Sequence, residues 1–436
     1  MSEWKTLPLR ELAEIRVSNV DKKSVPGEQP VLLCNYMDVY SNEYLTEDLQ
    51  YMSATATTAE IGRFSVGTGD VAITKDSETP DDIGIPAVAR KIPSDLVCGY
   101  HLALIKPDKT KINGEFLAKQ LASNETIRYF AQRASGSTRY GLSNGAIAST
   151  LIPHPPLPQQ RRIAEILSTV DAAIEATEAL IAKQQQIKAG LMHDLFTRGV
   201  WTDASIQQAR QAGLSAADSA RVGQLRPARE IAPELYKESP LGWIPKDWEV
   251  KLCAEISKRI CVGIVIQPTQ YYQEAGVSAF RSANIRENGL TLDDLVYISP
   301  EANAILANSQ VKGGDIVTVR TGYPGTSAVV PDDWGGHNCI DILITTPGER
   351  VLSKYLSAWI NSSFGKNQVL SKQGGLAQQH FNVGALRELK VRLPAIEEQH
   401  AIVERLESIN EELSKNDQYR HKMLLKKHGL MQDLLT

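Results

Sequence analysis

The chain lacks the marks of several large classes of protein. No apolar run approaches the roughly 18 residues that a helix needs to cross a bilayer, and the opening MSEWKTLPLR has no hydrophobic signal-peptide core. The five cysteines are scattered and form no CxxC pair, which argues against a disulfide framework and against a zinc site. These absences predict a cytoplasmic protein with no membrane segment and with reduced cysteines.

An excess of basic side chains is also lacking. The chain has 47 Lys and Arg against 51 Asp and Glu, which gives a formal net charge of −4. Proteins that coat nucleic acid regardless of its sequence usually have a positive net charge, so that role is disfavoured. Sequence-specific binding through local basic loops, with a partner that supplies further contacts, remains compatible with this charge.

The motifs of common catalytic sites are missing as well. The sequence contains no GxxxxGK[ST] phosphate loop, no GxGxxG that opens a helix, no HExxH and no GxSxG. It also contains no Asn-Pro-Pro-aromatic or Asp-Pro-Pro-aromatic signature of amino-methyltransferases and no nuclease motif of the Pro-Asp type, and its eight histidines are isolated from one another. We therefore expect no catalytic residue, no metal site and no bound cofactor in this chain.

The feature that is present is an internal repeat. Residues 190–197 read GLMHDLFT and residues 429–436 read GLMQDLLT, a shift of 239 residues (429 − 190). At the same shift, Gln160–Ile163 matches Gln399–Ile402 without a gap. A period of this length excludes solenoid repeats, whose units are about 20 to 50 residues long. The chain is therefore predicted to be a duplicated domain plus helix, in which the second half repeats the role of the first.

Each half is expected to be a mixed α+β domain followed by one long helix. Short β-rich runs lie between turn signals, and one helical segment stands out in each half. The β-rich runs are Val31–Leu33, Asp70–Thr74, Asp315–Val319 and Ile340–Ile344, and the helical segments are Glu115–Ala122 and Lys354–Asn361. The expected boundaries are 1–156 and 240–395 for the domains, 157–199 and 396–436 for the helices, and 200–239 for a linker or insertion that has no counterpart.

Both long helices carry the apolar seam of a coiled coil. Over their first part the apolar positions alternate in steps of four and three. Because the first helix must carry the chain from one domain to the other, an antiparallel pair is the simplest packing, and a helix of this length is a spacer by geometry. The polar residues Thr177 and Asn416 occupy the same slot of the seam, where such a residue fixes the register.

Two loop regions in each half combine glycine with hydrogen-bonding side chains. Arg can bond guanine and Gln can bond adenine in a bidentate manner, while hydroxyl groups and backbone amides suit phosphates. Ordinary solvated loops are the alternative for any single residue. If the loops do read bases, the two half-sites must differ, because the loop sequences differ. The candidate DNA-binding residues are Lys75, Ser77, Ser135, Gly136, Ser137, Thr138, Arg139 and Tyr140 in the first half, and Arg320, Thr321, Tyr323, Gly375, Gln378, Gln379 and His380 in the second.

These motifs together resemble a known family. The first long helix begins with PQQRRIAEIL and ends with GLMHDL, the second helix repeats both motifs in the same order, and the second domain opens with GWIPKDW at Gly242. This arrangement is similar to that of the DNA-specificity (S) subunit of type I restriction-modification systems, over nearly the whole chain. The segment at 200–239 departs from the pattern, because it is longer than a simple duplication needs.

The resemblance implies a noncatalytic subunit with two target-recognition domains and a pseudo-twofold internal repeat. Each domain would read one half of a bipartite, asymmetric site in double-stranded DNA, and the two helices would form an antiparallel coiled coil that sets the spacing. The implied partners are two methyltransferase subunits, which carry S-adenosylmethionine and methylate adenine N6, and restriction subunits, which use ATP and Mg. The residues implied for the spacer and its partners are Gln160, Ile163, Leu167, Leu191, Gln399, Ile402, Leu406 and Leu430.

Two other functions remain open at this point. One is a protein-interaction scaffold without sequence-specific DNA binding, which would show no DNA sequence preference even with its partners present. The other is an orphan or fused enzyme, which would require a catalytic motif or a metal-dependent activity of the isolated chain.

Overall fold

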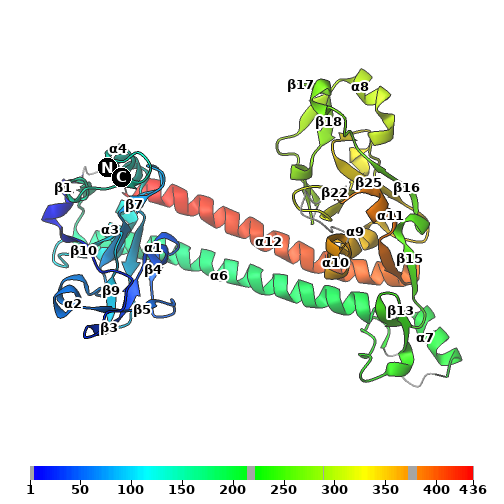
Figure 1. Cartoon of the computed structure of the whole chain (residues 1–436), viewed down its shortest axis with the longest axis horizontal. Helices are drawn as coiled ribbons and strands as arrows, with labels where there is room; N and C mark the ends of the chain where they lie inside the picture. Colours follow the sequence, from blue (N-terminus) through cyan, green and yellow to red (C-terminus); the bar gives the residue numbers. More distant parts are fainter. Residues whose placement is uncertain (1–3, 214–220, 288, 372–380, 436) are drawn as a thin grey trace. The chain divides into compact units, whose positions relative to one another are not determined.

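The computed structural model describes residues 4–213, 221–287, 289–371 and 381–435 (Figure 1). It divides into two compact units, one made of residues 1–178 and 418–436 and the other of residues 179–417. Both units contain a mixed α+β domain and a part of each of two long helices, α6 (Leu157–Thr197) and α12 (Ile396–Leu435). The predicted fold class is therefore confirmed.

The first unit is built around a five-stranded sheet with the order β2-β10-β6-β8-β4. Its two central strands, β6 (Val71–Thr74) and β10 (Leu102–Pro107), are apolar at almost every position because both faces of the sheet are covered. Successive residues of these two strands point to opposite faces of the sheet and belong to different apolar clusters. Val71, Ile73, Ala103 and Ile105 join one apolar cluster, whereas Ala72, Leu102 and Leu104 join another.

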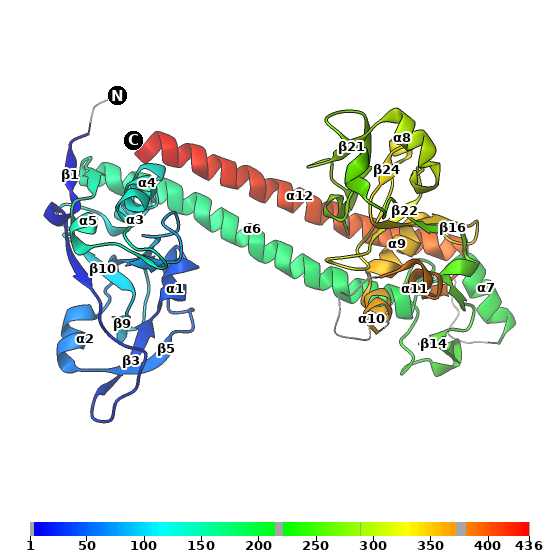
Figure 2. The same cartoon turned by 45° about the horizontal axis from the view of Figure 1, so that its top comes forward.

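Different elements cover the two faces of this sheet. On one face lies a three-stranded sheet with the order β5-β3-β9, together with α2 (Thr58–Phe64), and on the other face lie α3 (Gly114–Leu121) and α4 (Asn124–Arg133) (Figure 2). The remaining elements of this unit are β1 (Thr6–Pro8), β2 (Ala13–Val17), β3 (Gln29–Cys34), α1 (Tyr36–Tyr40), β4 (Tyr44–Leu45), β5 (Met52–Ala56), β7 (Asp76–Ser77), β8 (Pro86–Ala89), β9 (Leu96–Cys98), β11 (Tyr140–Gly141), α5 (Asn144–Ala148) and β12 (Leu151–Pro153).

The second unit repeats the central part of this plan. Its sheet has the order β16-β25-β22-β23, made of β16 (Ser257–Val262), β25 (Ile342–Pro347), β22 (Ile316–Val319) and β23 (Ser327–Val329). In both units a strand pair closes the domain just before the long helix, β1 with β12 in the first unit and β15 (Glu249–Leu252) with β26 (Lys390–Leu393) in the second. The order of strands thus confirms the duplication that the sequence predicts.

The second unit also has a further sheet with the order β17-β21-β18-β24, in which β18 pairs antiparallel with β21 and parallel with β24, as β3 does with β5 and β9 in the first unit. The bounds of the remaining elements are α7 (Asp203–Gln211), β13 (Tyr236–Ser239), β14 (Gly242–Pro245), β17 (Tyr272–Gln273), β18 (Val277–Phe280), β19 (Ile285–Arg286), β20 (Gly289–Leu290), β21 (Val296–Ile298), α8 (Pro300–Ile305), β24 (Asn338–Cys339), α9 (Ser353–Asn361), α10 (Ser363–Ser371) and α11 (Val383–Arg387).

One predicted strand boundary is wrong. The β-rich run at Ile340–Ile344 was expected to be one strand, but β25 begins at Ile342. Asp341 has a φ of 52°, a left-handed conformation that no strand contains. The backbone therefore turns at Asp341 before the strand starts.

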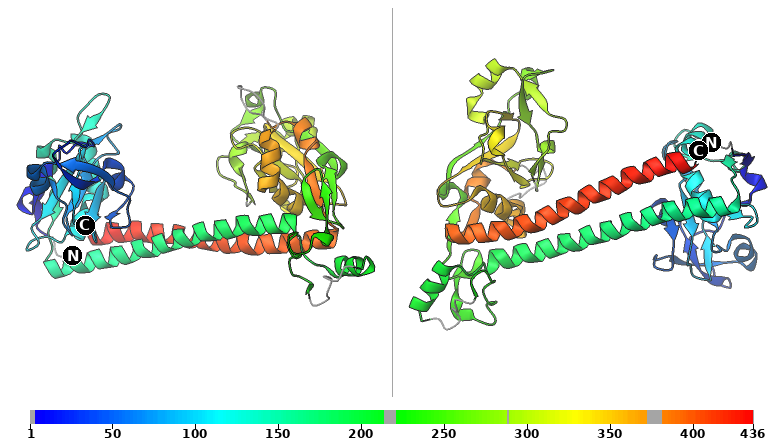
Figure 3. Two further views of the ribbon diagram at one scale, coloured as in Figure 1. Left: turned by 60° about the horizontal axis from the view of Figure 1, so that its bottom comes forward. Right: turned by 180° about the vertical axis from the view of Figure 1, so that it is seen from behind.

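The long helices pack antiparallel within each unit. In the first unit, Ile163 and Leu167 near the start of α6 share a core with Leu435 at the end of α12. In the second unit, Leu195 near the end of α6 shares a core with Ile402 near the start of α12. Figure 3 shows both pairs of helix ends side by side.

The polar residues of the seam are accommodated in different ways. The buried Thr177 hydroxyl donates a hydrogen bond to the Ala173 carbonyl one turn back in the same helix, at 2.6 Å. The Asn416 amide instead donates to Gln184 Oε1 on the facing helix, at 2.8 Å. Of these two polar residues, Asn416 is therefore the one whose side chain links the two helices by a hydrogen bond that can hold their register.

Within the second unit, the described part of the segment at 200–239 is held to its surroundings by a buried charge. Arg226 is 1% exposed, and its guanidinium forms an ion pair with Glu398 at the start of α12 and another with Asp247, at 2.7 Å. Glu398 also accepts hydrogen bonds from the indole N–H of Trp248, at 3.0 Å, and from the backbone N–H of Val200, at 2.7 Å. This segment is therefore fixed where α6 ends and α12 begins, and its last residues form β13, which pairs with β14.

Candidate nucleic-acid interface and spacer helices

In the first unit the two predicted loops lie side by side. The loop after β6 contains Lys75 and continues into β7, which pairs with β11, so that Ser77 faces Tyr140. The backbone N–H of Leu142 donates to the Lys75 carbonyl at 2.9 Å, and Ser135 forms a further bridge to Gly141. Two segments about 60 residues apart in sequence therefore form one surface.

The side chains on this surface differ in their accessibility. The residues from Ser135 to Arg139 are exposed, whereas Ser77 is buried and its hydroxyl accepts a hydrogen bond from the Thr79 backbone N–H at 3.3 Å. Gly136 has a φ of 150°, and a Cβ at this position would lie 1.9 Å from the Arg139 carbonyl oxygen. Ser77 and Gly136 thus shape the loops, while Ser137, Thr138 and Arg139 are presented to solvent.

Several residues that the sequence analysis missed surround the first loop. His101 Nδ1 lies 2.5 Å from Asp76 Oδ2, and the Lys75 ammonium lies 3.2 Å from the other oxygen of the same carboxylate. The rings of Tyr36 and Tyr40 stack at 5.5 Å. Burial, followed by the negative charge of Asp82, raises the pKa of Tyr36. No motif marks these side chains, because they come from separate elements that only the fold brings together.

The second unit has its corresponding loop after β22. Arg320 donates to Asp341 at 2.6 Å, and the Thr321 hydroxyl lies 3.4 Å from the second carboxylate oxygen. Tyr323 is 84% exposed between two glycines with positive φ, Gly322 and Gly325. This loop therefore presents an aromatic ring to solvent beside a paired arginine.

The other predicted loop of the second unit is only partly described. Gly375, Gln378, Gln379 and His380 lie outside the described residues. Where the description resumes, the Phe381 backbone N–H donates to the Arg320 carbonyl at 3.0 Å. Phe381 occupies the place that Leu142 has in the first unit, 239 residues earlier (381 − 142). In both units this position therefore donates the same kind of backbone hydrogen bond to the loop that leaves β6 or β22.

Gln160 anchors the first domain to the start of its long helix. It is fully buried, and its Oε1 accepts a hydrogen bond from the Asn113 backbone N–H at 2.8 Å. Its Nε2 donates to the carbonyls of Lys111, at 3.1 Å, and Pro155, at 2.8 Å. All three partners belong to the same unit, so this side chain is an internal clamp.

Gln399 makes the same three hydrogen bonds in the second domain. Its Oε1 accepts from the Leu352 backbone N–H, and its Nε2 donates to the carbonyls of Arg350 and Pro394, each at 2.9 Å. Gln399 is also fully buried. The sequence analysis assigned both glutamines to the spacer and its partners. The structure places them inside, where their side chains hold domain to helix.

The predicted apolar spacer residues also face inward. Ile163, Leu167, Ile402 and Leu406 are buried in the cores that join helix to domain, and Leu191 and Leu430 are partly buried against those cores. The exposed apolar side chains of the long helices are other residues, which lie off the predicted seam. They are Leu180 and Ile187 on α6 and Leu424 and Leu425 on α12.

A buried charge network joins the first domain to both helices. Lys119 on α3 binds Asp171 on α6 at 2.5 Å and Glu43 at 2.7 Å, and Lys427 on α12 binds Asp171 at 2.8 Å. The hydroxyl of Tyr44 donates to Asp171 at 2.5 Å. Burial alone would raise the pKa of Asp171, but the charge of Lys119, together with these hydrogen bonds, outweighs burial and lowers it.

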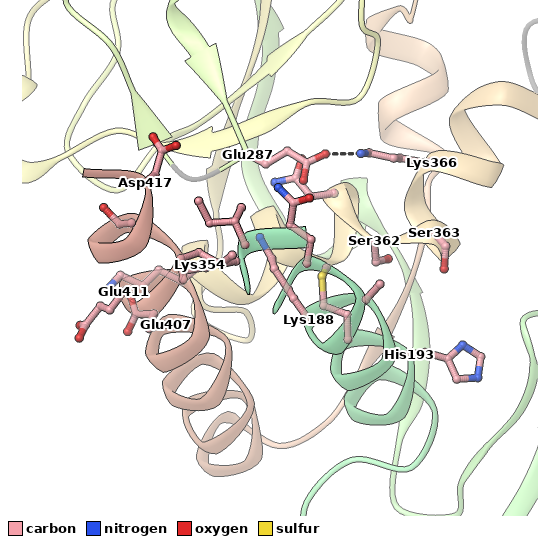
Figure 4. Close-up of a pocket in the computed structure, with 18 of the residues that line it drawn as sticks. Lys188, His193, Glu287, Lys354, Ser362, Ser363, Lys366, Glu407, Glu411 and Asp417 are labelled. Carbon is pink, nitrogen blue, oxygen red and sulfur yellow. Dashed lines mark hydrogen bonds and ion pairs between the residues drawn. The ribbon is translucent and has the colours of Figure 1, made fainter. Parts of the chain in front are cut away.

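The second unit has an open groove at the corresponding place. At the repeat shift of 239 residues, Ala358 replaces Lys119 and Asn410 replaces Asp171, while Lys188 corresponds to Lys427. The groove has a volume of about 1050 Å³. Lys188 extends into it from α6, and Glu407 lies on its α12 side (Figure 4). Two ion pairs line it, Lys354 with Glu407 and Lys366 with Glu287. The two copies thus share a backbone plan but differ in how the domain meets the helices.

Two further observations concern the described residues alone. No three His, Cys, Asp or Glu side chains among them are grouped as ligands of a metal ion would be. None of the helices in the same part of the chain has both the length and the apolar character required to cross a bilayer.

Comparisons with known proteins agree with this architecture. The family profile described as "Type I restriction modification DNA specificity domain" matches residues 1–187 and 245–419. The specificity subunit of the type I restriction enzyme EcoBI from Escherichia coli is 26% identical over 303 residues, which cover 68% of this chain and 59% of that protein. The MjaVIII specificity subunit from Methanocaldococcus jannaschii is 25% identical over 305 residues, which cover 65% of this chain and 61% of that protein. The chain thus spans about three-fifths of the length of these two relatives.

A solved structure extends the comparison to the whole chain. The crystal structure of a type I restriction-modification S subunit from M. genitalium has a TM-score of 0.56 at 13% identity, and the match covers 99% of this chain and 96% of that chain. At this level of identity the likeness concerns the fold, which is the arrangement of two mixed domains and two long helices.

Proposed function

Because the chain belongs to the family of type I restriction-modification DNA specificity proteins, we propose that it is the noncatalytic subunit that reads a bipartite, asymmetric site in double-stranded DNA. One observation carries this proposal. In each domain a polar loop leaves the same strand of the sheet and is joined by a backbone hydrogen bond to a second segment, at Leu142 in the first domain and at Phe381 in the second, and the loop sequences differ. Two equivalent surfaces with different side chains suit two different half-sites.

The exposed groups on these surfaces suit DNA. In the first domain Ser137, Thr138 and Arg139 supply hydroxyl groups and a guanidinium, which bond phosphates and base edges. In the second domain the exposed Tyr323 supplies an aromatic ring, and Arg320, partly exposed and paired with Asp341, supplies a cation. The net charge of −4 indicates that a partner supplies further electrostatic attraction.

The proposed partners are two methyltransferase subunits and the restriction subunits of the same system. The methyltransferase subunits would hold S-adenosylmethionine, the restriction subunits would hold ATP and Mg, and the assembly would act on cytoplasmic DNA. Leu180 and Ile187, seven residues apart on one face of α6, support docking on the spacer, because exposed apolar side chains of this size mark interaction sites when they lie together. The chain itself would bind no cofactor.

The proposed role of α6 and α12 is a ruler between the half-sites. The buried clamps of Gln160 and Gln399 support this role, because they fix each domain to the end of a helix. Inserting four residues, about one helical turn, into both helices should change the number of base pairs tolerated between the half-sites. An unchanged spacing would contradict the ruler.

The test of the function is a genome-wide map of adenine methylation in cells that express the methyltransferase subunit with and without this chain. A split, asymmetric motif that is methylated only when the chain is present is the expected result. Replacing residues 1–156 with the corresponding domain of a relative should then change one half of that motif and leave the other half unchanged. Unchanged methylation, with both proteins expressed and associated, would favour a scaffold without DNA sequence preference.

A further inference from the structure

Both domains contain a left-handed residue other than glycine at the same place. His101, with a φ of 73°, directly precedes β10, and Asp341, with a φ of 52°, directly precedes β25. These strands have the same position in the two sheets, next to β6 and β22. A side chain at positive φ is sterically disfavoured and persists only where its surroundings hold it, which occurs often at functional sites.

Each of these residues contacts the loop that leaves the neighbouring strand. His101 Nδ1 lies 2.5 Å from Asp76, two residues after β6. Asp341 accepts a hydrogen bond from Arg320, the first residue after β22, at 2.6 Å, and lies 3.4 Å from the hydroxyl of Thr321. The acidic residue has exchanged places with its partner between the copies. It is Asp76, on the loop, in the first domain and Asp341, on the turn before the strand, in the second.

The same point of each loop is also tied to the second loop. The Lys75 backbone N–H donates to the His101 carbonyl at 2.9 Å, and the Lys75 carbonyl accepts from Leu142 at 2.9 Å. In the second domain the Arg320 carbonyl accepts from Phe381 at 3.0 Å. The side-chain pair therefore lies beside this backbone hydrogen bond in both domains.

We propose that His101 and Asp341 are positioning residues for half-site recognition. The left-handed turn aims each side chain at the neighbouring loop, and the resulting pair fixes the loop surface so that its exposed groups meet the bases in one arrangement. The inference deepens the proposed function and depends on it. Loss of the pair should reduce discrimination between bases in one half-site, because a loop that moves accepts several bases at the same position.

The experiment uses the assembled methyltransferase complex with full-length chains. Glycine accepts the left-handed backbone but removes the pair, so His101→Gly and Asp341→Gly test the side chains without adding backbone strain. Asparagine also accepts this backbone and keeps a short hydrogen-bonding group, so His101→Asn and Asp341→Asn are the conservative variants. Asp294→Gly is the matched control, because Asp294 also has a positive φ of 52° and, among the described residues, its side chain forms no hydrogen bond with the loop after β6 or β22.

The readout is the methylated motif together with the thermal midpoint of each complex. His101→Gly should reduce base discrimination about tenfold or more at one or more positions of one half-site, and Asp341→Gly should do so only in the other half-site. The asparagine variants should retain most of the discrimination, and Asp294→Gly should leave both half-sites intact.

Two results would overturn the inference in distinguishable ways. If the glycine variants lower methylation evenly while both half-sites keep their sequence, the residues have only a structural role and the inference fails alone. If the unaltered chain directs no split motif, the proposed function fails, and the inference fails with it.

Discussion

Gln160 and Asn113 are joined by a hydrogen bond of 2.8 Å between a fully buried side chain and a backbone N–H that lies outside any regular hydrogen-bond ladder. The same side chain satisfies two carbonyls, so one residue saturates three backbone groups at the junction of domain and helix. The repeat of this arrangement at Gln399 explains why a glutamine stands at the same place in both copies.

Gln160→Ala should destabilise the first domain by roughly 2 to 4 kcal/mol, because it removes the hydrogen bonds to the Asn113 N–H and the Pro155 carbonyl and leaves the Lys111 carbonyl with His154 alone. The check is the free energy of unfolding by urea. Gln399→Ala should cost about as much in the second domain. Gln159→Ala, at an exposed neighbouring position, should change the free energy by less than about 0.5 kcal/mol, and an equal loss at Gln159 would contradict the clamp.

Asp171→Asn should be among the most destabilising single changes in the chain. It leaves Lys119, which is 4% exposed, and Lys427 with Glu43 as their remaining carboxylate, and removing one partner of a buried ion pair costs at most roughly 3 to 5 kcal/mol. Denaturant unfolding measures the loss. The control is Asn410→Ala at the equivalent position of the second copy, where Ala358 replaces the lysine, and it should cost far less.

The same carboxylate predicts a dependence of stability on pH. Because the pKa of Asp171 is lowered in the folded chain, its contribution is present above the unfolded pKa of about 4 and is lost as the pH falls through the folded pKa. The difference in unfolding free energy between the unaltered chain and Asp171→Asn should therefore shrink below about pH 4. Unfolding by urea at stepped pH values tests this, and a constant difference down to pH 3 would contradict it.

Arg226→Met should destabilise the second unit by roughly 3 to 5 kcal/mol, since it leaves Glu398 buried without its cation. The double variant Arg226→Met, Glu398→Gln should recover a large part of this loss, because the uncompensated charge is then gone. Thermal unfolding gives both values. Arg229→Met, an exposed change nearby, should cost less than about 1 kcal/mol.

Tyr323→Ala should affect DNA recognition and leave stability unchanged. The ring is 84% exposed, so its loss should alter the free energy of unfolding by less than about 0.5 kcal/mol. Binding of the assembled complex to its own site should weaken about three- to tenfold, the range for loss of one aromatic contact. Equilibrium binding to the specific duplex is the measurement. Ile305→Ala, 82% exposed in the same unit, should leave binding unaltered, and equal effects would remove Tyr323 from the interface.

The sequence predicted the features that repeat. Residues 116–197 match the second half without gaps, so the same junction of domain and helix was expected twice. The observed α6 and α12 begin and end within two residues of the expected bounds. The polar loops after Asp70–Thr74 and Asp315–Val319 were also recognisable, because their glycines and hydroxyl groups stand beside clear strands. That the two loops of the first domain touch followed only from the pairing of β7 with β11.

The features that differ between the copies were not predictable. The network around Asp171 combines residues 43, 119, 171 and 427, and no periodicity relates positions so far apart. The left-handed backbone of His101 and Asp341 carries no sequence mark either, because both residue types occur in every kind of structure. Gln160 was found as a repeated residue, but its repetition alone could not distinguish an internal clamp from a partner contact.

The two apolar clusters of the first domain share the strands β6 and β10, whose alternate residues belong to different clusters. Along both strands, each residue of one cluster is flanked by residues of the other. If one cluster loses its packing, the strands lose contacts that hold their register, and the other cluster is disrupted as well. Neither side of the sheet is therefore expected to stay folded without the other. Its melting is expected to be a single cooperative transition, and damage to either side of the sheet reaches the loops at its edge.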